Sequence, residues 1–159
     1  MKLNNPIDIE ILEFFKTGKF DYLKIGQSKE YILNNFPDPD YFTTYKEFSR
    51  YNIWCYGNIE LHFNDDILWM IFSDYIGTLN GGNSIRINKW ILSKPKKLNL
   101  LYTINQLNKE NIDFKKITDK KLQFVTLHLA SNVELSFHHQ DNDTENDPNN
   151  YMMESFYLK

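Results

Sequence analysis

The chain has 159 residues, of which 42% are hydrophobic and 16% aromatic, and its formal net charge is −3. This length and composition predict a single domain, residues 1 to 159, with enough apolar area for a core. The small negative charge argues against nucleic-acid binding, which needs clustered Lys and Arg, and no run approaches the roughly 20 apolar residues of a membrane-spanning helix.

The sequence also bears on the compartment. Cys55 is the single cysteine, so it has no partner for an internal disulfide bond. The first residues carry Asp8, Glu10 and Glu13 and lack the basic start and apolar run of a secretion signal. We therefore expect a cytoplasmic protein.

Two helices are predicted near the start of the chain. Apolar residues recur at helical spacing between Pro6 and Gly18, which predicts an N-terminal helix over residues 6 to 17. Ser28 has the side chain of a helix N-cap, and two prolines follow residue 36, so a second helix is expected over residues 29 to 35.

Strand patterns begin near residue 53. Residues 59 to 63 read Ile-Glu-Leu-His-Phe, the alternation of a strand with one buried face. A polar turn then leads into an apolar strand over residues 67 to 75, which predicts a hairpin. The Gly81-Gly82-Asn83 turn precedes a third expected strand over residues 84 to 92.

The second half of the chain repeats this order of elements. After Pro95, apolar residues on one helical stripe predict a helix over about residues 97 to 110. Alternating patterns then predict three strands, over residues 122 to 130, 133 to 138 and 152 to 158.

A short internal repeat supports a duplication. Residues 58 to 63 read Asn-Ile-Glu-Leu-His-Phe, and residues 132 to 137 read Asn-Val-Glu-Leu-Ser-Phe, at a separation of 74 (132 minus 58). The alternative is that two amphipathic strands have independently acquired similar residues from a small set of strand formers. We interpret the chain as two pseudo-repeats, about residues 20 to 92 and 97 to 159.

These elements predict an α+β fold in which helices cover one face of a mostly antiparallel sheet. The other face would be open to solvent and available to a partner protein, with a few aromatic side chains as anchors. The residues predicted on that partner-binding face are Glu60, His62, Trp69, His128, Glu134 and Ser136.

One part of the chain resembles a known class of proteins. Residues 25 to 32 (Ile-Gly-Gln-Ser-Lys-Glu-Tyr-Ile), 36 to 39 (Phe-Pro-Asp-Pro) and 53 to 63 (Ile-Trp-Cys-Tyr-Gly-Asn-Ile-Glu-Leu-His-Phe) resemble small bacterial immunity proteins. Such proteins are encoded beside polymorphic or contact-dependent inhibition toxins. The resemblance spans roughly residues 18 to 76 and implies a cytoplasmic antidote that binds one cognate toxin as a heterodimer. The helix start and the later Tyr-Gly strand also resemble the doubled α+β architecture of beta-lactamase inhibitory protein.

The negative charge is concentrated near the C-terminus. Five acids and no base lie between residues 141 and 154, so the rest of the chain has a charge near +2 (−3 minus −5). This segment is interpreted as a solvated loop, with a partner-binding acidic patch as the alternative. The acids that would contribute to such a patch are Asp141, Asp143, Glu145 and Asp147.

Two rivals to toxin binding remain open: an adaptor or regulatory module of similar fold, and a small hydrolase. The hydrolase would use Glu60, His62, Glu134 and His128 as acids and bases. None of these four stands in a recognised ligand spacing, and the adjacent His138 and His139 point to opposite sides of a strand. We therefore predict no catalytic residue, no metal and no cofactor.

Overall fold

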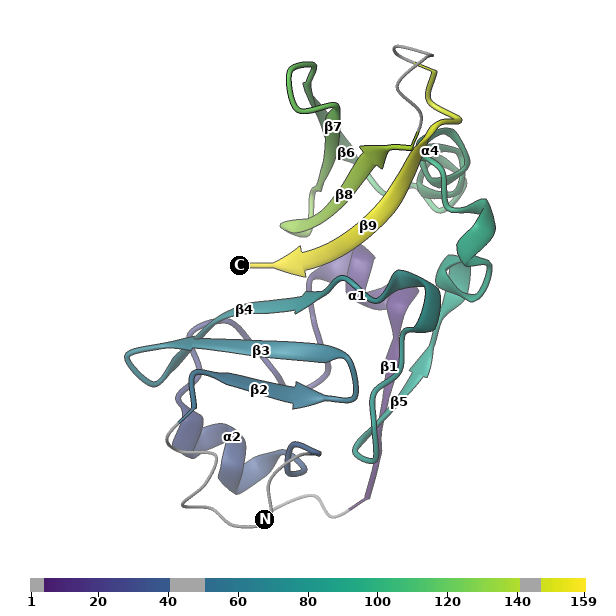
Figure 1. Cartoon of the computed structure of the whole chain (residues 1–159). Helices are drawn as coiled ribbons and strands as arrows, with labels where there is room; N and C mark the ends of the chain where they lie inside the picture. Colours follow the sequence, from purple (N-terminus) through teal and green to yellow (C-terminus); the bar gives the residue numbers. More distant parts are fainter. Residues whose placement is uncertain (1–4, 41–50, 141–146) are drawn as a thin grey trace.

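A computed structural model describes residues 5–40, 51–140 and 147–159 of the chain (Figure 1). Over these ranges it shows the predicted α+β class: three α-helices, a seven-stranded antiparallel sheet and a separate pair of parallel strands. No helix in these ranges combines the length and the apolar character needed to cross a membrane.

The first half of the large sheet is an antiparallel meander preceded by a helix. Its elements are α2 (Lys29–Asn35), β2 (Ile53–Tyr56), β3 (Ile59–Asn64) and β4 (Ile67–Ser73). The Ser28 hydroxyl accepts a hydrogen bond from the Tyr31 backbone N–H at 3.1 Å, as expected for an N-cap. The predicted helix and hairpin are therefore confirmed.

The predicted N-terminal helix over residues 6 to 17 is wrong at its start. Residues Ile7–Glu10 form strand β1, and helix α1 covers only Ile11–Thr17. β1 pairs in parallel with β5, Ile85–Asn88, which buries Ile7 and Ile9. Apolar residues at 7, 9 and 11 fit strand as well as helical spacing over so short a stretch, and pairing with β5 decides between them.

The predicted strand over residues 84 to 92 is also too long. β5 ends at Asn88, and Trp90–Ser93 form a 3-10 turn in which Trp90 has a φ of 46°. That left-handed backbone conformation cannot continue a strand. Two further single 3-10 turns lie at Ile76–Thr78 and Pro95–Lys97.

The second half contains the predicted helix and three predicted strands. They are α4 (Leu100–Lys109), β7 (Phe124–Leu129), β8 (Val133–His139) and β9 (Tyr151–Leu158). Strand β6, Phe114–Asp119, was not predicted. It lies at the edge of the sheet with five of its six residues exposed, so it lacks the alternation that marks a half-buried strand.

The strand order bears on the duplication. The large sheet runs β2-β3-β4-β9-β8-β7-β6, so β4 and β9 meet at its middle (Figure 1). Ile59 is the first residue of β3, and Val133 is the first residue of β8. β3 lies beside β4, and β8 lies beside β9. This is the arrangement expected for halves related by a two-fold axis. A common origin of residues 20 to 92 and 97 to 159 stays a prediction.

The core lies between one face of the sheet and the helices. Leu61, Leu135 and Phe156 point to this face and are fully buried. Phe14 and Phe15 of α1 contact the ring of Phe156 with centroid distances of 5.9 Å. The described helices therefore cover this face, and within the described ranges the opposite face of the sheet is left for other contacts.

Candidate functional site

The face of the large sheet that points away from the helices is continuous across its seven strands. Directly paired side chains form a row across it, because the register brings one residue of each strand beside the next. From β2 to β6 the row reads Cys55, Glu60, Phe72, Tyr157, Glu134, His128 and Lys115. Each member is exposed or half-buried, so we call this surface the open face.

The sequence-predicted site residues lie on this face with unequal exposure. Glu60, His62, Glu134 and His128 are half-buried, and Trp69 is 43% exposed at an irregularity in the β3–β4 register. Ser136 is only 7% exposed. Its register partners are Thr126 and Ser155, so Ser136 offers little surface on this face, and its contact with a partner stays a prediction.

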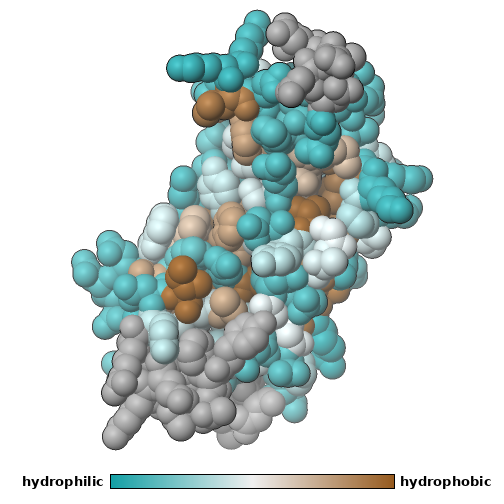
Figure 2. Space-filling view, viewed as in Figure 1, coloured by the Kyte–Doolittle hydropathy of each residue, from teal (hydrophilic) through white to brown (hydrophobic). Residues whose placement is uncertain are grey.

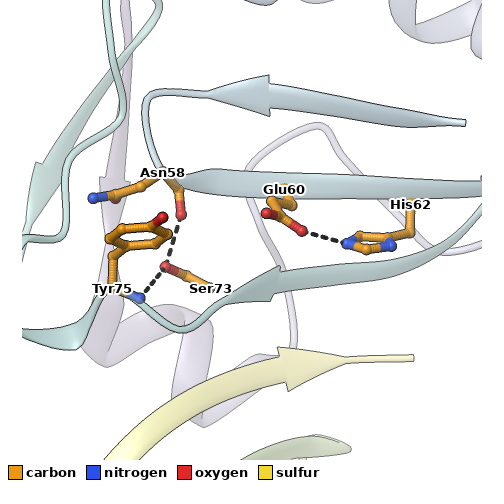
Figure 3. Close-up of polar contacts among 5 residues, drawn as sticks. All are labelled: Asn58, Glu60, His62, Ser73 and Tyr75. Carbon is orange, nitrogen blue, oxygen red and sulfur yellow. Dashed lines mark hydrogen bonds and ion pairs between the residues drawn. The ribbon is translucent and has the colours of Figure 1, made fainter. Parts of the chain in front are cut away.

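Glu60 and His62 form an ion pair along β3. Their positions two residues apart put both side chains on the same face of the strand. His62 Nε2 lies 2.7 Å from Glu60 Oε2, and the two side chains are 18% and 28% exposed (Figure 3). Among the described residues, His62 is the only polar partner of this carboxylate, so its second oxygen, Oε1, faces the surface.

Glu134 occupies the corresponding position on β8 but is held on both sides. The Tyr157 hydroxyl donates a hydrogen bond to Oε2, and His128 Nδ1 lies 3.4 Å from Oε1. Burial of the hydroxyl, followed by the hydrogen bond and the negative charge of Glu134, raises the pKa of Tyr157 to about 12. Both oxygens of this carboxylate are therefore engaged within the protein.

The two pairs do not meet at one point. Strands β3 and β8 are separated by β4 and β9, and three inter-strand spacings place their backbones about 14 Å apart. Phe72 and Tyr157 fill the row between them. Within the described ranges, no three His, Cys, Asp or Glu side chains are grouped as metal ligands. The four residues of the hydrolase alternative thus form two separate pairs.

Apolar side chains flank the Glu60–His62 pair on the open face. Ile53 of β2 is paired with His62 in register and is 45% exposed. The Trp69 ring lies 6.3 Å from the imidazole of His62, nearly perpendicular to it. Figure 2 shows hydrophobic residues as small separate areas within a mainly hydrophilic surface. Ile53 and Trp69 thus frame a polar pair with exposed apolar area.

A hollow of about 390 Å³ lies beside Glu60 and the β2–β3 turn. The described residues that line it are Cys55, Gly57, Asn58, Glu60, Tyr75, Thr78 and Asn80. Burial, together with the negative charges of Glu60 and Asp40, raises the pKa of the Cys55 thiol, so this group is uncharged at neutral pH. The hollow is therefore polar and has a carboxylate at its edge.

Sequence reasoning missed several residues of this surface. Ile53, Tyr75 and Tyr157 join it only through cross-strand register or the turn after β4. For Tyr157 a signal was available, because it alternates with Phe156 and Leu158 and must point away from the core. A third pair, His138 Nδ1 and Glu154 Oε1 at 3.6 Å, lies on the same face and was also missed.

The predicted acidic patch lies mostly outside the described residues. Asp141, Asp143 and Glu145 fall in the undescribed range 141–146. Asp147 is half-buried, and its Oδ1 accepts hydrogen bonds from the backbone N–H and the side-chain amide of Asn149. This local turn is what the structure describes of the acidic segment.

Comparison of the chain with protein-family models, with curated proteins and with solved structures gives no match.

Proposed function

We propose that the chain is an immunity protein, which binds a cognate toxin domain through the open face of its sheet and thereby neutralises it. The observation that carries the proposal is the exposed apolar pair Ile53 and Trp69 beside half-buried ionic groups, on the sheet face opposite to the described helices. Protein interfaces obtain most of their affinity from a few such anchors within a polar surround.

The dimensions of the open face support this use. Six inter-strand spacings of about 4.8 Å make it roughly 29 Å wide. A standard interface covers about 800 Å² on each partner, so a face of this width is comparable in size with one side of such an interface. The resemblance of residues 18 to 76 to immunity proteins supports a toxin as the partner and the cytoplasm as the compartment in which they meet.

The charge of the open face favours a basic partner surface. Glu60 and Glu154 each have a histidine as their neighbouring base, and neither carboxylate is deeply buried. A toxin that cleaves nucleic acid has a basic substrate-binding surface, which would associate quickly with these acids and with Asp147. The partner is therefore proposed to present Lys or Arg to this face.

Co-expression with the toxin encoded by the adjacent gene tests the proposal. Cells that make the toxin should survive only when this protein is also present, and the two should co-purify as a heterodimer. Survival without association would remove the binding mechanism, and absence of protection would remove the immunity assignment. Association without any toxic activity to neutralise would favour the adaptor alternative.

A matched pair of variants locates the interface. Trp69→Ala should weaken toxin binding by about 30-fold, the effect of losing an aromatic hot spot. Tyr31→Ala is the control, because Tyr31 is similarly exposed, at 47%, but belongs to helix α2 on the other side of the sheet. Equal losses in both variants, or none in Trp69→Ala, would show that the toxin does not bind to the open face.

A further inference from the structure

The hollow beside Glu60 differs chemically from the rest of the open face. Among its described lining residues Glu60 is the one with a formal charge at neutral pH, and the others supply neutral polar groups and the ring of Tyr75. Glu60 turns one oxygen toward His62 and the other toward the side where Asn58 and Tyr75 lie (Figure 3). The hollow thus combines an available carboxylate with an aromatic ring.

Hydrogen bonds fix the walls of the hollow. Ser73 Oγ donates to the Asn58 carbonyl at 2.8 Å and accepts from the Tyr75 backbone N–H at 3.3 Å (Figure 3). The Asn58 side chain donates to the Thr78 carbonyl at 2.9 Å and accepts from the Asn80 N–H at 2.8 Å. These contacts tie the end of β4 to the β2–β3 turn, so the hollow is formed before any ligand enters.

Tyr75 remains exposed within this rigid frame. Its backbone N–H donates to Ser73 Oγ and the residue is 54% exposed, so its ring is accessible to a ligand in the hollow. An aromatic ring attracts cations to its face, and the effect adds to that of a nearby carboxylate. The guanidinium group of arginine suits both, because it is planar, stacks on aromatic rings and carries five N–H donors.

We propose that this hollow receives an arginine side chain of the partner, with its guanidinium stacked on Tyr75 and donating to Glu60 Oε1. The proposal rests on the proposed function for the identity of the partner but not for the chemistry of the hollow. It assigns to Glu60 a partner contact in addition to its pairing with His62.

The chemistry is tested on the protein alone by NMR titration with three small probes. N-acetyl-arginine amide should shift the amide signals of Asn58, Glu60 and Tyr75, with N-acetyl-lysine amide binding several-fold more weakly. N-acetyl-citrulline amide, which has nearly the same shape and no charge, should leave them unchanged. Equal shifts with the arginine and citrulline probes, or arginine shifts spread outside the hollow, would overturn the proposal.

The same titration with two variants tests whether Glu60 binds the arginine probe. Glu60→Gln should weaken arginine binding about tenfold, since the amide oxygen of Gln still accepts a hydrogen bond but lacks the negative charge that attracts the guanidinium. Glu154→Gln is the matched control, because Glu154 lies on the same face, is also paired with a histidine and does not line the hollow. A Glu60→Gln protein that binds arginine as well as the parent would also overturn the proposal.

Double-mutant cycles with the toxin domain separate this inference from the proposed function. One arginine of the toxin should couple to Glu60, so that its change to alanine has about tenfold less effect in the Glu60→Gln background. If the toxin binds and no arginine couples to Glu60, the hollow is not the contact, although the proposed function stands. If the toxin does not bind at all, the proposed function fails, and the arginine titration still decides the chemistry of the hollow.

Discussion

Leu61→Ala and Leu135→Ala test the assignment of the two sheet faces and the integrity of the single domain. Leu61 lies between Trp54 and Ile71 in register, and Leu135 lies between Leu127 and Phe156. All of these side chains are buried, and both leucines have no exposed surface. Each substitution should therefore destabilise the protein by about 2 to 5 kcal/mol, through lost transfer free energy and the cavity left behind.

Urea unfolding monitored by tryptophan fluorescence measures this cost. Trp54 is fully buried beside Leu61, so its emission reports on the first half of the sheet, and circular dichroism reports on both halves. Glu60→Ala is the control on the same strand. It should cost at most about 1 kcal/mol, because half-exposed ion pairs contribute little to the free energy of unfolding.

Two results would refute this reasoning. Equal losses in Leu61→Ala and Glu60→Ala would mean that the core and open faces are assigned the wrong way round. In Leu61→Ala, the fluorescence transition could shift to lower urea concentration while the circular dichroism signal shows two separate transitions. That result would show that the halves unfold separately. The chain would then be two domains and not the single one predicted from its length.

Two further predictions concern the β2–β3 turn and the Glu134 contact. Gly57 has a φ of 59°, and a Cβ added there would lie within 2.5 Å of backbone atoms of Asn80 and Gly82. Gly57→Ala should therefore destabilise the protein by about 2 kcal/mol or more, measured in the same urea assay. Gly77→Ala, in open space, should change it by less than about 0.5 kcal/mol, and equal effects would refute the steric argument. The folded pKa of Tyr157, about 12, exceeds its unfolded value of about 10, so its contribution to stability is complete below pH 10 and is lost as the pH rises toward 12. Glu134→Gln should lower the pKa of Tyr157. The titration of Tyr157 is obtained as the phenolate absorbance that disappears when Tyr157 is changed to Phe, measured with and without Glu134→Gln. An unchanged titration would show that Glu134 does not accept the hydrogen bond of this hydroxyl.

Local signals in the sequence were sufficient for elements whose boundaries are encoded by their own residues. Helix α2 begins where Ser28 caps it, and the β3–β4 hairpin follows from the alternation of residues 59 to 63 and the polar turn after them. Strand β1 and strand β6 could not be predicted in this way. β1 is defined by its pairing with β5, which is distant in sequence, and β6 is an exposed edge strand. Neither residue pattern separates a strand from its alternatives.

In the candidate site, too, the features set by local spacing were predicted, and those set by strand pairing were not. Glu60 and His62 were predicted on one face because a two-residue spacing determines this for any strand. Their relation to Tyr157, Glu134 and Tyr75 depends on the order of strands in the sheet and on the conformation of the turn after β4. Register between strands is a tertiary property, so the row across the open face could not be obtained from the sequence.

The two glutamates of the repeated motif show how similar sequence can carry different roles. Glu60 and Glu134 follow the first residue of β3 and β8, and each lies beside an aromatic residue of the central strands, Phe72 and Tyr157 respectively. The phenylalanine leaves Glu60 one oxygen for a partner, whereas the tyrosine hydroxyl and His128 occupy both oxygens of Glu134. A single hydroxyl thus supplies the second partner that Glu134 has and Glu60 lacks among the described residues. If the halves share an origin and the proposed function holds, Glu60 serves a partner contact, whereas the equivalent Glu134 connects strands of its own sheet.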